Sequence, residues 1–211
     1  MRPTHKLVAV ATLLLTTALP AHAQTTLTFD DLDCGFGEIL ETYRGFAFEN
    51  TDCFDGSLDA ELGSGYFTVS GGSQVIFGAF GDPFEMSGAA PFNVIQFRVA
   101  SAWRDNLSLT IEGFFMGNLV QQQMLVLAGP SMPQTIVLNW MSIDRIRFST
   151  SGGIESTLEF DGTQAVIDDI SIGAVNSAVV PEPASVTLLA SGMLLMGIVI
   201  RHRKRQACRR K

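Results

Sequence analysis

The chain has 211 residues, of which 46% are hydrophobic and 17% are charged, and its formal net charge is −7. Most of the basic residues lie near the two ends, so residues 24–178 hold twenty acids against five arginines, a net charge of −15. Such a surface repels phosphates and argues against nucleic-acid binding. The three histidines (His5, His22 and His202) also lie outside residues 24–178, which excludes a histidine-dependent nucleophile or zinc site there.

The first 23 residues have the composition of a secretory signal peptide. Arg2 and Lys6 precede an apolar run at 7–19, and Ala21-His22-Ala23 supplies the small residues of a signal-peptidase site. We therefore expect residues 1–23 to be removed before Gln24 and the rest of the chain to be exported. A retained N-terminal membrane helix is the alternative, but the apolar run is short for that.

Residues 24–178 are long enough for one domain with its own core, and their pattern is that of short β-strands. Turn-forming Gly, Asp and Pro residues separate the strands, and Gly71-Gly72 looks like a hairpin turn. In chain order the predicted strands cover residues 26–30, 45–49, 66–69, 74–77, 93–100, 106–113, 118–127, 134–140, 143–149 and 165–172.

Alternating hydrophobic residues predict which face of two strands is buried. In 106–113, Leu107, Leu109 and Ile111 are expected to face inward, and in 93–100 the same is expected of Ile95 together with Phe97 and Val99. The series of strands predicts an all-β fold with two antiparallel sheets packed face to face. We expect a jelly-roll-like β-sandwich, with an immunoglobulin-like sandwich as the alternative.

Cysteine usage fits an oxidising compartment. Cys34 and Cys53 are the only cysteines in residues 24–178. A bridge between them would close a loop of about twenty residues and stabilise the fold by roughly 3 kcal/mol. We expect this disulfide rather than two free thiols.

Four aspartates form a candidate calcium site. Asp30 and Asp31 follow the first strand, and Asp168 and Asp169 lie near the last, so the two pairs would approach each other if the terminal strands pair. Ca²⁺ binds six to eight oxygen ligands, which carboxylates supply. Turn caps and solvated strand ends are the alternative, and no other cofactor is predicted.

Aromatic residues and loop acids give two further candidate sites. Of Tyr43, Tyr66, Trp103 and Trp140, we single out Tyr66 and Trp103 as possible glycan contacts, while Trp140 ends an apolar strand and is expected to be buried. An aromatic core is the alternative. A glycosidase would need two paired acids, and the candidates are Glu38, Glu41, Asp55, Asp59 and Glu61. Solvated loop acids are the more common case, and we expect no enzyme activity.

The end of the chain combines a proline motif, an apolar helix and a basic cluster. Pro181 and Pro183 flank Glu182 and keep the backbone extended, as in a site that another protein reads. Residues 184–200 carry no charge and would span about 26 Å as a helix, at the short end for crossing a bilayer. The basic residues that follow would stay in the cytoplasm and set the topology, namely Arg201, Arg203, Lys204 and Arg205. A plain single-pass anchor would not explain the paired prolines.

This order of parts resembles the PEP-CTERM sorting signal of Gram-negative bacteria. The resemblance covers residues 179–205, with residues 206–211 as a cytoplasmic tail, and its motif is Val180, Pro181, Glu182, Pro183 and Ala184. It implies processing by an exosortase, a membrane cysteine transpeptidase. It also implies an exported protein, held at the inner membrane before processing and associated with exopolysaccharide or biofilm matrix afterwards.

The domain itself has a weaker resemblance. Its short motifs recur in this order in exported β-sandwich domains that carry the PEP-CTERM signal, and such domains are similar in fold to carbohydrate-binding modules. The motifs are Phe-Asp-Asp-Leu at 29–32, Tyr-Arg-Gly-Phe-Ala-Phe at 43–48, Ser-Ala-Trp-Arg-Asp at 101–105, Ile-Glu-Gly-Phe at 111–114 and Ile-Asp-Asp-Ile at 167–170. We expect a non-enzymatic surface or matrix protein, with a carbohydrate-binding module and, less favoured, a secreted glycosidase as alternatives.

Overall fold

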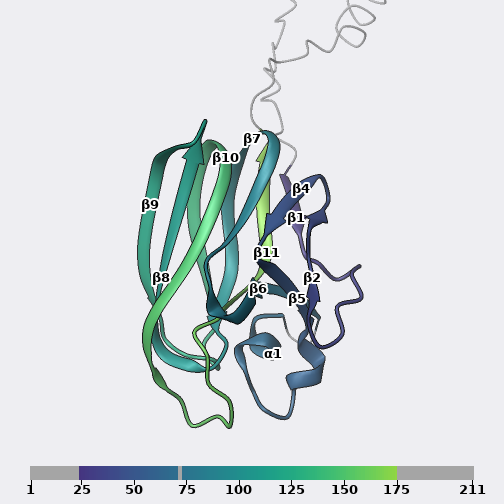
Figure 1. Ribbon diagram of the computed structural model, residues 1–211, viewed down its shortest axis with the longest axis vertical. Coiled ribbons are helices and arrows are strands. Elements are labelled where there is room, and N and C mark those ends of the chain that lie inside the picture. Colours follow the sequence, from purple (N-terminus) through teal and green to yellow (C-terminus); the bar gives the residue numbers. More distant parts are fainter. Residues whose placement is uncertain (1–23, 71–72, 175–211) are drawn as a thin grey trace, which may run out of the picture.

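The computed structural model describes residues 24–70 and 73–174, which form an all-β structure with few helices (Figure 1). Within these residues the strands are β1 (Gln24–Leu27), β2 (Glu38–Ile39), β3 (Thr42–Tyr43), β4 (Phe46–Glu49), β5 (Thr51–Asp55), β6 (Gln74–Gly78), β7 (Phe84–Ser101), β8 (Arg104–Phe115), β9 (Asn118–Leu127), β10 (Gln134–Glu155) and β11 (Ala165–Ala174). The helices are α1 (Gly65–Ser70), η1 (Gly56–Asp59) and η2 (Ala79–Gly81). The predicted all-β class is confirmed.

The predicted signal peptide (1–23), the C-terminal helix and sorting segment (179–205) and the tail (206–211) lie outside the described residues. Among the residues that are described, no helix is long and apolar enough to cross a membrane.

Hydrogen bonds connect the described strands into one branched sheet. Every pair is antiparallel, and the main order is β2-β5-β6-β11-β7-β10-β8-β9, with β1 beside β11, β4 beside β7 and β3 beside β4. The structure differs here from the predicted pair of separate sheets, because the two longest strands, β7 and β10, run through both layers.

The layers arise because β7 and β10 change partners along their length. The first half of β7 pairs with β4, and its second half pairs with β11. β10 pairs with β8 only from Arg145 onward, after register shifts between Val137 and Arg145. Gly113 of β8 lies against Trp140 of β10: a Cβ at position 113 would be 2.9 Å from Trp140 Cε3. Only glycine fits that approach without displacing the indole.

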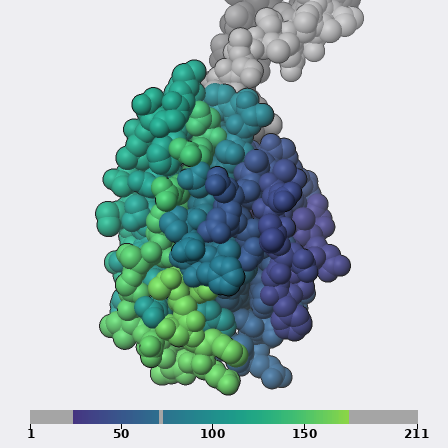
Figure 2. Space-filling view, viewed as in Figure 1, coloured from purple at the N-terminus to yellow at the C-terminus, as the bar shows by residue number. Residues whose placement is uncertain are grey.

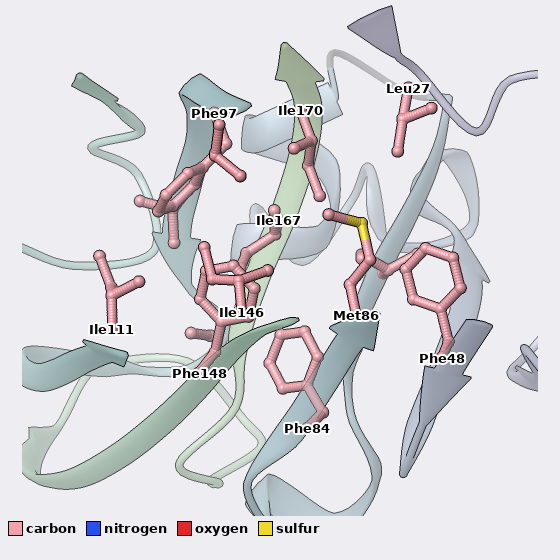
Figure 3. Close-up of a cluster of buried hydrophobic side chains, with 14 of the residues drawn as sticks. Leu27, Phe48, Phe84, Met86, Phe97, Ile111, Ile146, Phe148, Ile167 and Ile170 are labelled. Carbon is pink, nitrogen blue, oxygen red and sulfur yellow. The ribbon is translucent and has the colours of Figure 1, made fainter. Parts of the chain in front are cut away.

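The space between the layers holds the main core. Figure 3 shows its side chains, which come from β1, β4, β7, β8, β10 and β11: Leu27, Phe48, Phe84, Met86, Phe97, Ile111, Ile146, Phe148, Ile167 and Ile170. Phe148 stacks on Phe84 and meets Phe97 edge to face, with ring centroids 5.0 and 5.4 Å apart. The predicted inward positions Leu107, Leu109 and Ile111 are confirmed, since all three are fully buried.

A second hydrophobic cluster lies on the other face of β5, β6, β7 and β11, and we refer to it as the α1 cluster. It consists of Phe54, Tyr66, Val69, Val75, Phe77, Ala100, Ala102 and Val166, with Trp103 packed against it. The chain therefore buries both faces of these strands, and β6 accordingly reads as an apolar run from Val75 to Phe77.

Three details of the predicted strands need correction. The segment 66–69 belongs to helix α1, so the hairpin expected at Gly71-Gly72 has no first strand. The helix forms because Tyr66 and Val69, three residues apart, both face the α1 cluster. The predicted strands 134–140 and 143–149 are two parts of β10, separated by its register shifts.

The alternation expected in 93–100 is broken within β7. Val94 and Phe97 are both fully buried in the main core, whereas Ile95 is only partly buried. A bulge causes this, because the pairing of β10 with β7 shifts between Gln96 and Val94. The prediction for Ile95 is therefore wrong, and those for Phe97 and Val99 are confirmed.

The terminal strands pair with each other, and the predicted disulfide is present. Gln24 of β1 lies opposite Gly173 of β11, so both ends of this domain lie at one end of the molecule, opposite α1 (Figure 1). Cys34 and Cys53 are bonded with their Cα atoms 5.4 Å apart. Both are buried in the main core, where they join the loop after β1 to β5.

Candidate functional site

A cleft opens over the α1 cluster at the end of the molecule that holds α1. Its volume is about 420 Å³ and its walls are largely apolar. The lining residues come from the disulfide loop, β5, η1 with the turn after it, α1, β6, the β7–β8 turn and the β10–β11 loop: Phe36, Phe54, Leu58, Asp59, Leu62, Tyr66, Phe77, Trp103 and Phe160. Six separate parts of the chain besides α1 thus converge on one hollow, which we call the aromatic cleft.

Helix α1 is held tightly against the end of β7. The backbone N–H of Gly65 donates a hydrogen bond to the carbonyl of Ala102 over 3.0 Å. A Cβ at position 65 would lie only 2.0 Å from the Ser101 carbonyl oxygen, so glycine is needed for this approach. At the other side of the helix, the Thr68 hydroxyl donates to the carbonyl of Pro130.

The floor of the aromatic cleft is Tyr66. Its ring centroid is 4.8 Å from that of Phe54, 5.0 Å from Phe77 and 5.7 Å from Trp103. Only 5% of Tyr66 is exposed, and burial, helped by the negative charges of Asp59 and Asp52, raises the pKa of its phenol above the ordinary value. Tyr66 therefore stays neutral and offers a ring and a hydroxyl.

The rim is formed by exposed apolar side chains. Phe36 is 84% exposed and Phe160 53% exposed, and Phe160 lies 5.4 Å from the half-buried Trp103, measured between ring centroids. The loop that carries Phe160 is fixed by Arg104, whose guanidinium binds both carboxylate oxygens of Asp161 over 2.7 and 2.6 Å. An open aromatic surface held by an ordered loop can stack on a flat apolar face of a ligand.

The sequence prediction found the two inner aromatic residues of this cleft but missed its rim. Tyr66 and Trp103, predicted as possible glycan contacts, line the same cleft. Phe36 and Phe160 were not singled out, although each stands in a polar, turn-forming context: Phe36 between two glycines, and Phe160 between two acids. A lone aromatic residue in such a loop has no strand partner to bury it, and that is the signal that could have identified them.

The other two aromatic residues have structural roles. Trp140 is buried in the main core, as predicted. Tyr43 is buried as well, and its hydroxyl donates to Asp31 Oδ1 over 2.5 Å, while Arg44 binds Asp31 Oδ2 over 2.7 Å. These two hydrogen bonds hold the pKa of Asp31 below its usual value.

The predicted calcium ligands do not form one cluster. The terminal strands pair as expected, but Asp31 binds Tyr43 and Arg44, and Asp169 lies 3.8 Å from the guanidinium of Arg98. No group of three or more acid, cysteine or histidine side chains suited to a metal ion occurs in residues 24–70 and 73–174. Calcium binding thus stays a prediction without a gathered ligand set.

Asp168 is the one buried acid of that group. It is 3% exposed, and burial, together with the negative charges of Asp169 and Asp30, raises its pKa to about 7. The backbone N–H of Asp169 donates to Asp168 Oδ1 over 2.7 Å, which only partly offsets this.

The acids weighed for glycoside hydrolysis are engaged locally or exposed. Asp55 caps η1 by accepting from the N–H and hydroxyl of Ser57, and Asp59 accepts from the Ser64 hydroxyl. Glu38, Glu41 and Glu61 are exposed. Of the five, only Asp59 lines the aromatic cleft.

The end of the chain matches a known family model. The model described as the PEP-CTERM protein-sorting motif matches residues 179–204, which confirms the predicted resemblance to this sorting signal. The chain therefore carries a sorting motif of exported proteins. No curated protein matches the chain.

Among solved structures, the chain is similar to a DUF4465 family protein from Bacteroides caccae ATCC 43185, with 11% identity and a TM-score of 0.43 over 71% of this chain and 98% of that one. It is also similar to TmCBM61, solved with β-1,4-galactotriose, with 12% identity and a TM-score of 0.37 over 64% and 91% of the two chains. A third is a mutant of the lectin binding domain of lectinolysin complexed with Lewis b, with 12% identity and a TM-score of 0.33 over 64% and 97%. We draw no functional conclusion from similarities this low.

Proposed function

We propose that this chain is an exported, non-enzymatic protein that an exosortase sorts and cleaves, and that its β-sandwich then serves at the cell surface or in an exopolysaccharide or biofilm matrix. The observation that carries the proposal is the PEP-CTERM motif at residues 179–204, which begins shortly after the last strand ends at Ala174. The Cys34–Cys53 bridge agrees with export, because disulfides persist in oxidising compartments.

Each part of the C-terminal segment has a role in this proposal. Pro181, Glu182 and Pro183 would be the element that the exosortase recognises. The apolar residues 184–200 hold the chain in the inner membrane, and the basic cluster from Arg201 to Arg205 keeps the tail in the cytoplasm. The domain would then lie outside the inner membrane, attached to it through its C-terminal end, and the aromatic cleft would lie at the opposite end of the domain.

Intact-mass measurement of the protein from an exosortase-competent host tests the sorting step. We expect a mass that lacks residues 1–23 and 184–211. Glu182→Ala should leave the C-terminal segment in place, whereas the matched control Glu155→Ala, at an exposed position in β10, should be processed normally. Retention of residues 184–211 in the unchanged protein would reject the proposal.

Carbohydrate binding is the second candidate function, and the observation that favours it is the convergence of Tyr66 and Trp103 on one open cleft with Phe36 and Phe160 at its rim. The ligand would be a neutral glycan, since the domain carries a net charge of −15 and would repel an acidic one unless divalent cations bridged the two. For the strand arrangement, we further propose that the β-sandwich is a jelly roll.

Affinity electrophoresis in gels containing neutral polysaccharides tests this second candidate. A retarded band is expected, and Phe160→Ala should remove the retardation. Met116→Ala is the control and should leave the retardation unchanged. It truncates an exposed side chain in the turn between Phe115 of β8 and Asn118 of β9, outside the residues that line the cleft. Equal loss in both variants, or no retardation by any glycan, would exclude the cleft as a sugar site.

Calcium binding by the predicted aspartates can be tested by a direct measurement. A rise in melting temperature in millimolar calcium would support a site at Asp30, Asp31, Asp168 and Asp169. An unchanged melting temperature would reject it.

A further inference from the structure

One long segment of this acidic domain carries no charged residue, although Glu112 of β8 lies beside it, opposite Gln122. Residues 113–143 contain no Asp, Glu, Lys or Arg, although residues 24–178 have a net charge of −15. Of the fourteen large hydrophobic residues that are exposed in the described parts of the chain, eight lie in this segment: Met116, Leu119, Val120, Met124, Val126, Met132, Val137 and Met141. Exposed apolar side chains are thus concentrated where charge is absent.

The centre of this segment is β9, a free edge of the sheet. Within the part of the chain that the structure describes, β9 pairs with β8 alone. From Gln121 to Leu127 the ladder with β8 runs without a bulge, and the register shift lies before it, near Phe114. In Figure 1 β9 lies at the outer margin of the sheet, and in Figure 2 the teal atoms of this part of the chain reach the surface along the same margin.

Edge strands usually carry features that prevent further pairing. Charged side chains, prolines and bulges along the edge are the common ones, because the outer N–H and C=O groups are otherwise ready to bind another strand. Gln121–Leu127 has neither a charge nor a proline, and Met124 is 71% exposed. This stretch therefore lacks the usual protection.

We propose that two copies of this chain associate by antiparallel pairing of their β9 strands across a two-fold axis. A second copy fits this edge because it presents the same uncharged strand, so pairing of the two β9 strands brings no charged side chain of either strand against another. The net charge of −15 on each domain repels the other copy at every other orientation, which leaves the β9 edge as the face where two copies can approach.

The side chains of β9 suit a self-pairing of this kind. Gln121 and Gln123 carry amides that both donate and accept, so glutamines facing each other across the two-fold axis can hydrogen-bond. The amide nitrogen of Gln122 donates to Glu112 of β8 over 3.3 Å, and its amide oxygen can accept from the second copy. Met124 and Val126 add apolar contacts on the exposed face. Because the pairing is two-fold, it occupies the β9 edge of both copies and closes as a dimer.

Cysteine cross-linking in the producing cells tests the geometry. Near a two-fold axis, an introduced cysteine lies close to the same cysteine of the second molecule. Gln122→Cys or Met124→Cys should therefore give disulfide-linked dimers of the exported full chain on non-reducing gels. Ser151→Cys is the matched control, because Ser151 is exposed but sits in β10 opposite Ser108 of β8. Dimers from Ser151→Cys at the same level, or none from the two β9 variants, would overturn the proposal.

A charge variant tests the energetics without new chemistry. Met124→Lys places two like charges in the paired edge, and we expect the dimer dissociation constant, measured by sedimentation, to rise about tenfold or more. Ser151→Lys makes the same change in net charge and should leave the dimer dissociation constant unaltered. Unchanged melting temperatures of both variants would show that they fold normally. A wild-type protein that sediments as a monomer at every concentration, or that forms open-ended assemblies, would contradict a closed β9 dimer.

Discussion

The main core and the α1 cluster are built on opposite faces of the same strands. On β6, Ile76 points into the main core while Val75 and Phe77 point into the α1 cluster, and on β11 the same holds for Ile167 and Val166. The main core is closed by a second layer of sheet. The α1 cluster is covered chiefly by one six-residue helix, which leaves the aromatic cleft open.

This difference shows how similar side chains serve two purposes. Phe97 and Phe148 are excluded from water on all sides and contribute to stability. Phe36 and Phe160 lie at the edge of the smaller cluster, where little covers them, so their apolar surface is available to a ligand. Variants that affect one region and spare the other test the distinction.

The largest effect is expected from emptying the main core. Phe97→Ala should lower the free energy of unfolding by about 3–5 kcal/mol, because it removes a fully buried ring and leaves a cavity between the layers. Phe36→Ala, which truncates a side chain that is 84% exposed, should change it by about 0.5 kcal/mol or less. Urea unfolding of the two variants measures both values, and similar losses would mean that the cleft rim is part of the core.

Loss of the disulfide should come next. Cys34→Ala with Cys53→Ala should lower the free energy of unfolding by about 3 kcal/mol, since the bridge closes a loop of 19 residues in sequence separation and restricts the unfolded chain. The main core contains both cysteines, so the midpoint of urea unfolding should fall. An unchanged midpoint would show that the bridge adds no stability.

A pH-dependent effect is expected from Asp168. Its pKa is about 7 in the folded protein against 3.8 for the ordinary group, so the folded state holds this proton more tightly. The contribution of Asp168 to the free energy of unfolding is therefore fully present below about pH 4 and is lost as the pH rises through about 7.

Asp168→Asn removes the buried charge and keeps an oxygen that can accept from the N–H of Asp169. The variant should match the wild type near pH 4 and exceed it near pH 8, by on the order of 2 kcal/mol. Melting curves across this range provide the measurement. A wild type whose stability does not fall relative to the variant between these pH values would show that Asp168 is not held neutral.

The sequence was informative wherever residues of one kind followed the period of a strand. The alternation of Leu107, Leu109 and Ile111 predicted their burial, and strand 118–127 was predicted with the bounds that the structure has. The pairing of the two cysteines and the sorting segment also followed from composition and motif alone.

Features that depend on distant contacts could not be predicted in this way. Tyr66 and Val69 have strand-forming side chains, yet the approach of Gly65 to Ser101 and Ala102 fixes their segment as a helix. The bulge that turns Ile95 away from the core depends on the pairing of β7 with β10, which local alternation does not reveal. The aromatic cleft joins residues from 36 to 160, so only the folded chain brings its rim together.

The smallest change in stability is expected from the rim residue Phe160, and a spectroscopic readout makes it visible. The protein has two tryptophans, of which Trp140 is buried in the main core and Trp103 lies 5.4 Å from Phe160, between ring centroids. In a Trp140→Phe background, emission reports on Trp103 alone. Phe160→Ala should then increase quenching of this emission by acrylamide, because it uncovers one face of the indole, while the melting temperature stays nearly constant. Met116→Ala in the same background should leave the quenching unchanged. If Phe160→Ala lowers the melting temperature as much as a main-core truncation does, then the cleft is closed in solution and Phe160 belongs to the hydrophobic interior.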